Sequence, residues 1–246
     1  MRLDGKTAVV TGGGSGFGAG IARAFAAEGA KVMIADLNAD AAKSVAVEVG
    51  GYAVTTNVAD NASVAGLAYA VADQLGDLDI LVNNAGTTHA LGAMEDVNEE
   101  EFDRVFAVNA KSVYLTARHL VPAMKARKSG VILNIASAAS VSPRPNLIWY
   151  SASKGWMITT TKAMAIELAP YNIRVNALNP VAGDTPLLAD FMGGESPEMR
   201  AKFLSGIPLG RFSTPDDIGA AATFLCSDSA GLITGVALEI DGGRTI

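Results

Sequence analysis

Short runs of apolar, often β-branched residues alternate with longer stretches of helical periodicity along the chain, and this alternation constrains the fold more than any other feature. The runs predict strands at residues 7–10, 31–35, 52–56, 78–82, 131–135, 173–177 and 236–240. The stretches between them predict helices at residues 21–28, 39–49, 62–75, 99–127, 151–168 and 215–226. Most of the strands are continuously apolar, which is typical of strands buried on both faces of a parallel sheet.

The alternation therefore predicts an α/β fold, a doubly wound sheet of seven parallel strands with helices on both faces. Because the sequence contains no repeat, low-complexity tract or linker, we expect residues 1–246 to form a single domain. The stretch from Pro180 to Pro208 is the least regular. In a doubly wound sheet, ligands bind beyond the carboxyl ends of the strands, and the motifs described below all fall there.

Composition excludes several classes of function. The chain has 25 Asp and Glu against 19 Lys and Arg, a net charge of −6, which argues against nucleic acid or anionic lipid as a partner. Its apolar stretches are far shorter than the roughly 20 residues of a membrane span, and its first residues show no apolar leader. Cys226 is the only cysteine, so we expect no intrachain disulfide, no metal site and a reducing, cytoplasmic location.

A glycine-rich turn, Thr11–Gly18, lies between the first predicted strand and the first predicted helix. Glycines let backbone N–H groups approach a pyrophosphate at a helix N-terminus, where the helix dipole favours negative charge. A tight turn without a ligand is the alternative for this motif taken alone. The candidate phosphate-binding residues are Gly12, Ser15, Gly16, Phe17 and Gly18.

Asp36 ends the second predicted strand. A carboxylate there can accept hydrogen bonds from both ribose hydroxyls of NAD and would repel the 2′-phosphate of NADP. Positions 15, 37 and 38 hold no Arg or Lys, so we expect NAD, with NADP less favoured. The alternative is a solvated Asp that opens the next helix.

Two further turns are candidates for the adenosine half of the cofactor. Asn57 and Val58 follow the third predicted strand, and Asn83–Gly86 follows the fourth. Asn84, Ala85 and Gly86 are small or amide-bearing residues on which a base and a ribose can pack. Either turn alone is more often only a turn.

Tyr150-x-x-x-Lys154 has the spacing that places two side chains on one helix face. An ammonium group beside a phenol favours the phenolate, and a pKa near 7 would require roughly 4 kcal/mol of stabilisation of that form. Ser137 ends the fifth predicted strand and could polarise a substrate oxygen, although such a Ser is usually a cap. Asn109 lies within a predicted helix, where Asn is mildly unfavourable unless it has a particular role.

Taken in order along the whole chain, these motifs resemble those of the short-chain dehydrogenase/reductase family in its single-domain form. The resemblance implies a Rossmann-type fold and a catalytic tetrad of Asn109, Ser137, Tyr150 and Lys154. It also implies that Pro180 and Val181 lie in the loop at the nicotinamide carboxamide, that Thr185 contacts the carboxamide or the pyrophosphate, and that the chain forms a homotetramer. Two residues depart from the family pattern, namely Asn57 in place of an aspartate and Val181 in place of a glycine.

In the mechanism that the resemblance implies, Tyr150 is the general base in oxidation and the general acid in reduction. Ser137 hydrogen-bonds the substrate oxygen. Lys154 lowers the pKa of Tyr150 and holds the nicotinamide ribose, and Asn109 fixes a water that relays the proton. The hydride passes to or from the nicotinamide.

The substrate is a small molecule, and its candidate contacts are His89, Arg144, Asn146, Trp149 and Phe191. The polar members of this set would suit a hydroxyl-rich or anionic substrate, and the aromatic members an apolar one. Three functions remain open. They are an NAD-dependent dehydrogenase of a secondary alcohol, polyol or sugar; a reductase of 3-oxoacyl thioesters; and a cofactor-binding protein without catalysis.

Overall fold

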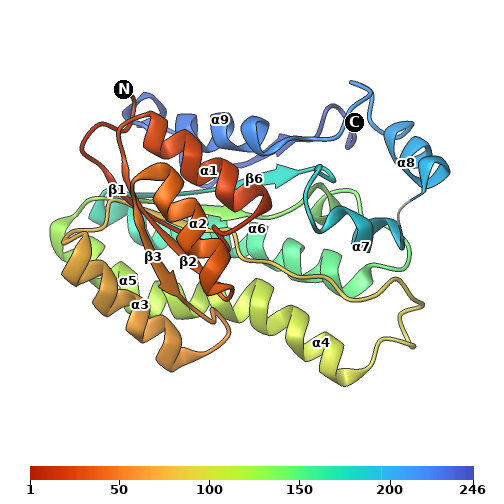
Figure 1. Ribbon diagram of the computed structural model, residues 1–246, viewed down its shortest axis with the longest axis horizontal. Helices are drawn as coiled ribbons and strands as arrows, with labels where there is room; N and C mark the ends of the chain where they lie inside the picture. The colour runs from red at the N-terminus through yellow and green to blue at the C-terminus, as the bar shows by residue number, and fades with distance from the viewer. Residues whose placement is uncertain (195) are drawn as a thin grey trace.

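The computed structural model of the protein describes residues 1–194 and 196–246 and shows seven parallel strands in one sheet (Figure 1). Their order across the sheet is β3-β2-β1-β4-β5-β6-β7, the doubly wound order of a Rossmann-type fold, which confirms the predicted fold class. The strands are β1 Thr7–Thr11, β2 Lys31–Asp36, β3 Tyr52–Thr55, β4 Ile80–Asn83, β5 Gly130–Ile135, β6 Ile173–Pro180 and β7 Ala237–Ile240.

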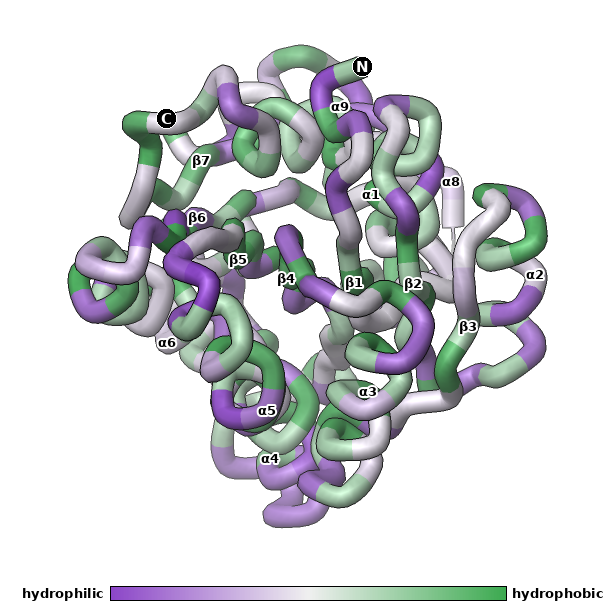
Figure 2. Tube along the Cα trace, turned by 90° about the vertical axis from the view of Figure 1, so that its left-hand side faces the viewer, coloured by the Kyte–Doolittle hydropathy of each residue, from purple (hydrophilic) through white to green (hydrophobic). Residues whose placement is uncertain are grey.

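Helices cover both faces of the sheet. Figure 2 looks along the sheet, with α1 and α9 above the row of strands and α3 and α5 below it. The helices are α1 Gly16–Ala27, α2 Ala39–Val49, α3 Asn61–Gln74, α4 Glu99–Phe106, α5 Ser112–Arg127, α6 Ile148–Leu168, α7 Leu188–Met192, α8 Pro197–Leu204 and α9 Pro215–Cys226.

The continuous apolar character of the strands follows from burial on both faces. In β1, Ala8 and Val10 pack into the core beneath α1, α2 and α9, whereas Val9 between them packs into the core beneath α3, α5 and α6. Successive side chains of a strand point to opposite faces. A strand with a core on each side therefore needs an apolar residue at every position.

Polar caps set where several of the helices begin. The side chain of Asn38 accepts a hydrogen bond from the N–H of Ala41 at the start of α2. At the start of α9, Thr214 and Asp217 each accept from the other's backbone N–H, a reciprocal capping box. These caps satisfy N–H groups that have no partner within the helix.

The structure differs from the predicted helices in four places. The helix predicted at 99–127 is interrupted at residues 107–111 by a π-helical turn that contains Asn109. α1 begins at Gly16 rather than at residue 21, because its first turn consists largely of glycines, which weaken the helical signal. α6 begins at Ile148 rather than at residue 151, so that Tyr150 lies in its first turn. The irregular stretch after β6 contains α7 and α8.

Candidate active site

A cavity of about 830 Å³ lies at the carboxyl ends of the central strands, where the fold class places a ligand. Residues at or after the carboxyl ends of all seven strands contribute to its wall. Their representatives are Gly12 after β1, Asp36 at the end of β2, Asn57 after β3, Asn84 after β4, Ser137 after β5, Val181 after β6 and Arg244 after β7. The sheet thus brings together motifs that are far apart in the sequence.

The glycine-rich turn has a geometry that side chains would block. Gly12 and Gly16 have φ values of +61° and +51°, in the left-handed region that favours glycine. A Cβ on Gly18 would collide with the carbonyl oxygen of Gly12 and lie 2.5 Å from Nδ2 of Asn84. Ser15 precedes α1, and its side chain makes no capping hydrogen bond. The turn is therefore shaped so that an anion can approach the helix N-terminus.

Asn84 holds this turn in place rather than pointing its amide into the cavity. Its Nδ2 donates to the carbonyl oxygens of Thr11 and Gly12 at 2.9 and 3.0 Å. Its backbone N–H donates to Oγ1 of Thr11 at 3.0 Å. Two loops from neighbouring strands are thereby fixed to each other.

Asp36 lies at the cavity wall and also braces the glycine turn. One carboxylate oxygen accepts from the N–H of Gly14 at 2.9 Å, and the other from the N–H of Asn38 at 2.9 Å. A carboxylate oxygen has more than one lone pair, so both oxygens can still accept from a ligand hydroxyl. Asn57 and Val58 line the same part of the cavity, with Oδ1 of Asn57 accepting from the N–H of Ala59.

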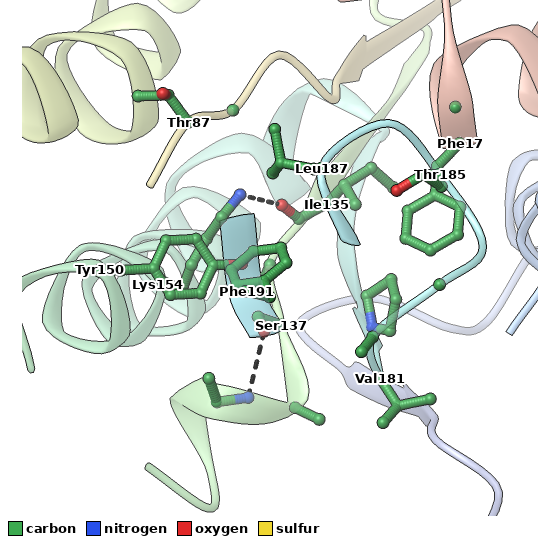
Figure 3. A pocket seen from close by; sticks show the side chains of 18 of the residues that line it. Phe17, Thr87, Ile135, Ser137, Tyr150, Lys154, Val181, Thr185, Leu187 and Phe191 are labelled. Carbon is green, nitrogen blue, oxygen red and sulfur yellow. Dashed lines mark hydrogen bonds between the residues drawn. The ribbon is translucent and has the colours of Figure 1, made fainter. Parts of the chain in front are cut away.

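Tyr150 is buried in the first turn of α6, with its ring 5.0 Å from that of Phe191 in an edge-on arrangement (Figure 3). Burial raises the pKa of Tyr150 to about 12, and a hydrogen bond with the Ser137 side chain acts in the opposite direction. This is the reverse of the lowering we expected Lys154 to cause. Tyr150 and Ser137 both line the cavity, so both can face a ligand there.

Lys154 lies one helical turn beyond Tyr150, and its ammonium donates to the carbonyl oxygen of Ile135 at 2.7 Å (Figure 3). Burial lowers the pKa of Lys154 to about 8, because an apolar environment disfavours the charged form. A Cβ on Gly86 would lie 3.3 Å from the Lys154 nitrogen and 3.5 Å from Oδ1 of Asn109. Gly86 therefore keeps the space between these two groups open.

Asn109 is fully buried in the π-helical turn and lies behind the cavity wall rather than in it. Its Oδ1 accepts from the N–H of Thr87 at 2.9 Å, and its Nδ2 donates to the carbonyl oxygen of Thr87 and to Oγ of Ser153. The amide thus ties the loop after β4 to α6, the helix that carries Tyr150 and Lys154.

On the β6 side, Pro180, Val181 and Thr185 all line the cavity. Val181 packs in an apolar cluster under α7 and α8, and its N–H donates to the carbonyl oxygen of Ile240 at 3.2 Å. A Cβ on Gly16 would lie 3.3 Å from Thr185. Thr185 therefore lies directly against the glycine turn.

Of the five candidate substrate contacts, Arg144 and Phe191 line the cavity, and the other three lie outside its lining. His89 is buried, with Nδ1 hydrogen-bonded to the carbonyl oxygen of Ala90. Trp149 donates through its indole N–H to the carbonyl oxygen of Met94. Asn146 is an exposed turn residue with φ +64°.

Several residues that line the cavity were not identified from the sequence. Examples are Thr87, Ile135, Leu187, Lys202 and Arg244. Ile135 acts through a backbone carbonyl, which carries no sequence signal. Arg244 had a usable signal, because it follows the last strand and so belongs to the same edge of the sheet as the other motifs. Lys202 lies in α8, whose helical pattern was not recognised.

Among residues 1–194 and 196–246, no helix has the length and apolarity needed to cross a bilayer. Within the same residues, no group of three or more His, Cys, Asp or Glu side chains could hold a metal ion.

Comparison with known proteins agrees with this geometry. A family model described as enoyl-(acyl carrier protein) reductase matches residues 12–245. The chain is 49% identical to 4-formylbenzenesulfonate dehydrogenase of Comamonas testosteroni over 252 residues that cover all of both chains. It is 39% identical to D-threitol dehydrogenase of Mycolicibacterium smegmatis, over all of this chain and 95% of the relative.

A similar solved structure is the 3-ketoacyl-(acyl-carrier-protein) reductase of Brucella melitensis complexed with NADH. It superposes with a TM-score of 0.95 at 50% identity and covers 99% of this chain and 100% of that one. Family model, relatives and structure agree over nearly the full length. The chain belongs to the short-chain dehydrogenase/reductase family.

Proposed function

We propose that the protein is an NAD-dependent oxidoreductase that transfers a hydride between nicotinamide and a secondary alcohol, polyol or sugar, or the matching carbonyl compound. Membership of the family makes it an oxidoreductase acting on CH–OH groups. The observation that carries the proposal is that the buried Tyr150, Ser137 and Lys154, one helical turn beyond Tyr150, all line the same ligand-sized cavity.

The residues around the cavity fit a dinucleotide. The turn at Gly12–Gly18 would take the pyrophosphate, since a Cβ at Gly18 would fill the space that the backbone needs. Asp36, Asn57 and Val58 would hold the adenosine half, and Val181 and Thr185 would lie at the other end. The bound nicotinamide would supply the hydride acceptor or donor.

The side chains of the tetrad provide proton transfer and orientation. At neutral pH a phenol with a raised pKa is protonated, so Tyr150 is ready to give its proton to a carbonyl oxygen in reduction. Ser137 donates a hydrogen bond to the same oxygen and fixes its position. In oxidation Tyr150 takes the alcohol proton, and the nearby Lys154 ammonium favours its phenolate form. Asn109 acts by positioning the loop at Thr87 and helix α6.

The preference for NAD follows from Asp36. Its carboxylate lies at the cavity wall and would repel a 2′-phosphate, while the ribose hydroxyls of NAD could donate to it. The similar Brucella structure was obtained with NADH, which supports the preference for NAD over NADP.

Reduction of 3-oxoacyl thioesters is the second candidate, and the similarity to the 3-ketoacyl-(acyl-carrier-protein) reductase of Brucella melitensis favours it. One argument weakens this alternative. The basic residues that could receive an acyl carrier protein are Lys125, Arg127 and Lys128 at the end of α5. Arg127 hydrogen-bonds the carbonyl oxygen of Leu78 just before β4, so this patch lies at the opposite end of the strands from the cavity.

A substrate panel tests the proposal. NADH formation would be followed with polyols, aldoses and secondary alcohols, and with the alcohol of 4-formylbenzenesulfonate because of the Comamonas relative. NADPH and NADH consumption would be followed in parallel with a 3-oxoacyl thioester. Oxidation of an alcohol with NAD supports the first function, whereas thioester reduction with NADPH would establish the second and contradict the cofactor choice.

Tyr150→Phe tests the role of the phenol. We expect turnover to fall by about a thousandfold or more, because proton transfer loses its donor and acceptor, while the dissociation constant of NADH changes little. Tyr52→Phe, at a hydroxyl on an edge strand outside the cavity lining, is the matched control. Retained activity in Tyr150→Phe would remove this residue as the general acid and base.

A further inference from the structure

The wall of the cavity carries an excess of positive charge. Its cationic side chains belong to Arg104, Arg144, Lys154, Lys202 and Arg244. Asp36 is the only acidic residue in the lining, as far as the described part of the chain shows. In a protein with a net charge of −6, such a lining requires an explanation.

Two of the five cations donate to backbone carbonyl oxygens. Arg104 donates to Oγ1 of Thr87 at 2.5 Å and to the carbonyl oxygen of Thr88 at 3.0 Å, so it braces the loop after β4. Lys154 donates to the carbonyl oxygen of Ile135 and belongs to the tetrad. Arg144, Lys202 and Arg244 remain, and we call these three residues the cationic cluster.

The cationic cluster lies at the end of the cavity remote from Asp36. Arg144 follows β5, Lys202 lies in α8 after β6, and Arg244 follows β7. These three strands form one half of the sheet, whereas Asp36 ends β2 in the other half. Ser137 also follows β5, so the tetrad lies on the same side of Asp36 as the cationic cluster.

Contacts bring Arg144 and Arg244 onto one patch of the wall, beside the helix that carries Lys202. The guanidinium carbon of Arg144 lies 3.9 Å above the ring of Phe203, the residue next to Lys202. Nη1 of Arg244 donates to Oγ of Ser142, in the same loop as Arg144, at 3.4 Å. Gly206 lies against Arg244, since a Cβ there would lie 3.6 Å from its Nε.

No carboxylate balances this cluster within the residues that the structure describes. The ion pairs found there involve none of the three cations. Asp241, near Arg244 in sequence, accepts from the N–H groups of Gly243 and Thr245 and from the Thr245 hydroxyl. Both burial and the charge of Arg244 lower the pKa of Arg144. Holding like charges together is unfavourable, and a bound anion would offset that cost.

Apolar side chains line the cavity between the tetrad and the cationic cluster. Phe191 packs edge-on against Tyr150, and Met192, Phe203 and Ile207 continue the apolar wall. A ligand that extends from Tyr150 to the cations therefore crosses an apolar surface. This favours a molecule with an apolar body over a fully hydroxylated one.

We infer that the cationic cluster is an anion-binding subsite, and that the substrate is an organic acid with a carboxylate or sulfonate at the end remote from its reacting carbon. The inference rests on the proposed function, because Tyr150 defines the reacting end. It narrows the substrate class from alcohols in general to alcohols or carbonyl compounds that carry an acidic group on an apolar body.

The test uses matched substrates that differ in charge. 4-Acetylbenzoate and its methyl ester, and 4-acetylbenzenesulfonate and its sulfonamide, would be reduced with NADH by the wild type and by Arg144→Gln, Arg144→Lys and Arg244→Gln. We expect kcat/KM for the acids to fall about tenfold or more in both Gln variants, since each loses a charge-assisted hydrogen bond. For the neutral analogues, kcat/KM should change less than about twofold. In Arg144→Lys, kcat/KM for the acids should recover most of the loss seen in Arg144→Gln.

Arg118→Gln removes an exposed arginine of α5 outside the cavity lining and is the matched control. Thermal unfolding of each variant would show that it is folded, and Arg244→Gln provides a test that is independent of the packing of Arg144 on Phe203. An unchanged ratio of acid to neutral kcat/KM in both Gln variants would overturn the inference. So would an equal loss of NADH affinity, which would assign the cations to the cofactor.

Calorimetric binding of 4-acetylbenzoate separates this inference from the proposed function, because it requires no turnover. Binding that weakens about tenfold in Arg144→Gln but not in Arg118→Gln supports the subsite even if no alcohol or ketone reacts. An affinity for 4-acetylbenzoate that neither Arg144→Gln nor Arg244→Gln changes would contradict the subsite. Equal affinities for the acid and its ester would contradict it as well. Preference for phenylphosphonate over both singly charged acids would contradict the assigned anion class.

Discussion

Lys154 is a buried cation, and its burial has a measurable cost. Its side chain is 4% exposed, and its pKa of about 8 lies below the usual value for lysine. Because the pKa is depressed in the folded state, the folded protein binds this proton less tightly than the unfolded chain does. Below pH 8 the group is protonated in both states and the full cost is present, and the cost disappears as the pH rises toward 10.5.

We therefore expect Lys154→Met to raise the free energy of unfolding at pH 7 by about 1–3 kcal/mol while it abolishes turnover. The advantage of the variant should shrink between pH 8 and pH 10, as the wild-type lysine loses its charge. Urea unfolding at pH 7 and pH 9.5, without cofactor, measures the difference. Lys162→Met, at an exposed lysine of the same helix, should show no such trend. A destabilised Lys154→Met at pH 7 would contradict the prediction.

Asp36 combines two tasks that a substitution can separate. Its carboxylate accepts from the N–H groups of Gly14 and Asn38, and in the proposed function its negative charge would disfavour NADP. In Asp36→Asn the amide oxygen can keep one of these hydrogen bonds, but the charge is lost. We expect the ratio of kcat/KM for NAD to that for NADP to fall by about tenfold or more.

Steady-state kinetics with both cofactors give this ratio. Asp40→Asn, at an exposed acid of α2 outside the cavity lining, serves as the control. If both variants keep the wild-type ratio, Asp36 does not select the cofactor.

Among the elements, the turn between β1 and α1 tolerates side chains least. A Cβ at Gly18 would meet both the carbonyl oxygen of Gly12 and the amide of Asn84 that fixes the turn. Gly18→Ala should therefore displace the phosphate-binding backbone. We expect KM for NAD to rise by about tenfold or more and the free energy of unfolding to fall by about 1–3 kcal/mol.

Gly66→Ala is the matched control for this prediction, because Gly66 also lies within a helix but has open space around its Cα. Alanine favours a helix over glycine, so this variant should be more stable by about 0.5–1 kcal/mol with unchanged KM. Equal effects of the two substitutions would show that the turn is not sterically constrained.

The sequence predicted whole elements better than their ends. Continuous apolar runs were sufficient for the strands, because burial on both faces imposes the same requirement at each position. The π-helical turn around Asn109 was not predictable, since a single extra residue in a helical run leaves the periodicity almost unchanged. The start of α1 was missed because its first turn consists largely of glycines, which weaken the helical signal.

Some residues of the candidate site were likewise predictable from the sequence, and others were not. Residues in motifs at strand ends, such as Asp36 and Ser137, were predictable because parallel strands deliver their carboxyl ends to one edge. His89 and Trp149 are near these motifs in sequence, but local loop geometry turns them away from the cavity. Arg244 comes from the far end of the chain, and only the strand order β6-β7 brings it beside the loop after β5.

At the scale of the whole molecule, the faces of α5 and α6 bear on assembly. The inner faces of these helices are buried within the protomer, where Met124 and Met157 pack in apolar clusters. Other residues of the same helices face outward. Tyr114 is 53% exposed and Trp156 38%, and with Phe106 they line a shallow depression beside the π-helical turn.

We expect two protomers to cover this depression in a homotetramer, because large aromatic side chains on neighbouring helices form an apolar patch that association would remove from water. Light scattering should give a mass about four times the 25.2 kDa of one chain. In Trp156→Glu, burying a charge at the interface should shift the mass to that of a smaller species. Tyr69→Glu, at an exposed residue of α3, should leave the mass unchanged.

A wild-type mass near 25.2 kDa would exclude an oligomer. A tetramer that survives Trp156→Glu would place the interface on another surface. Since the π-helical turn that holds Asn109 also lines the depression, loss of assembly in Trp156→Glu should lower turnover as well.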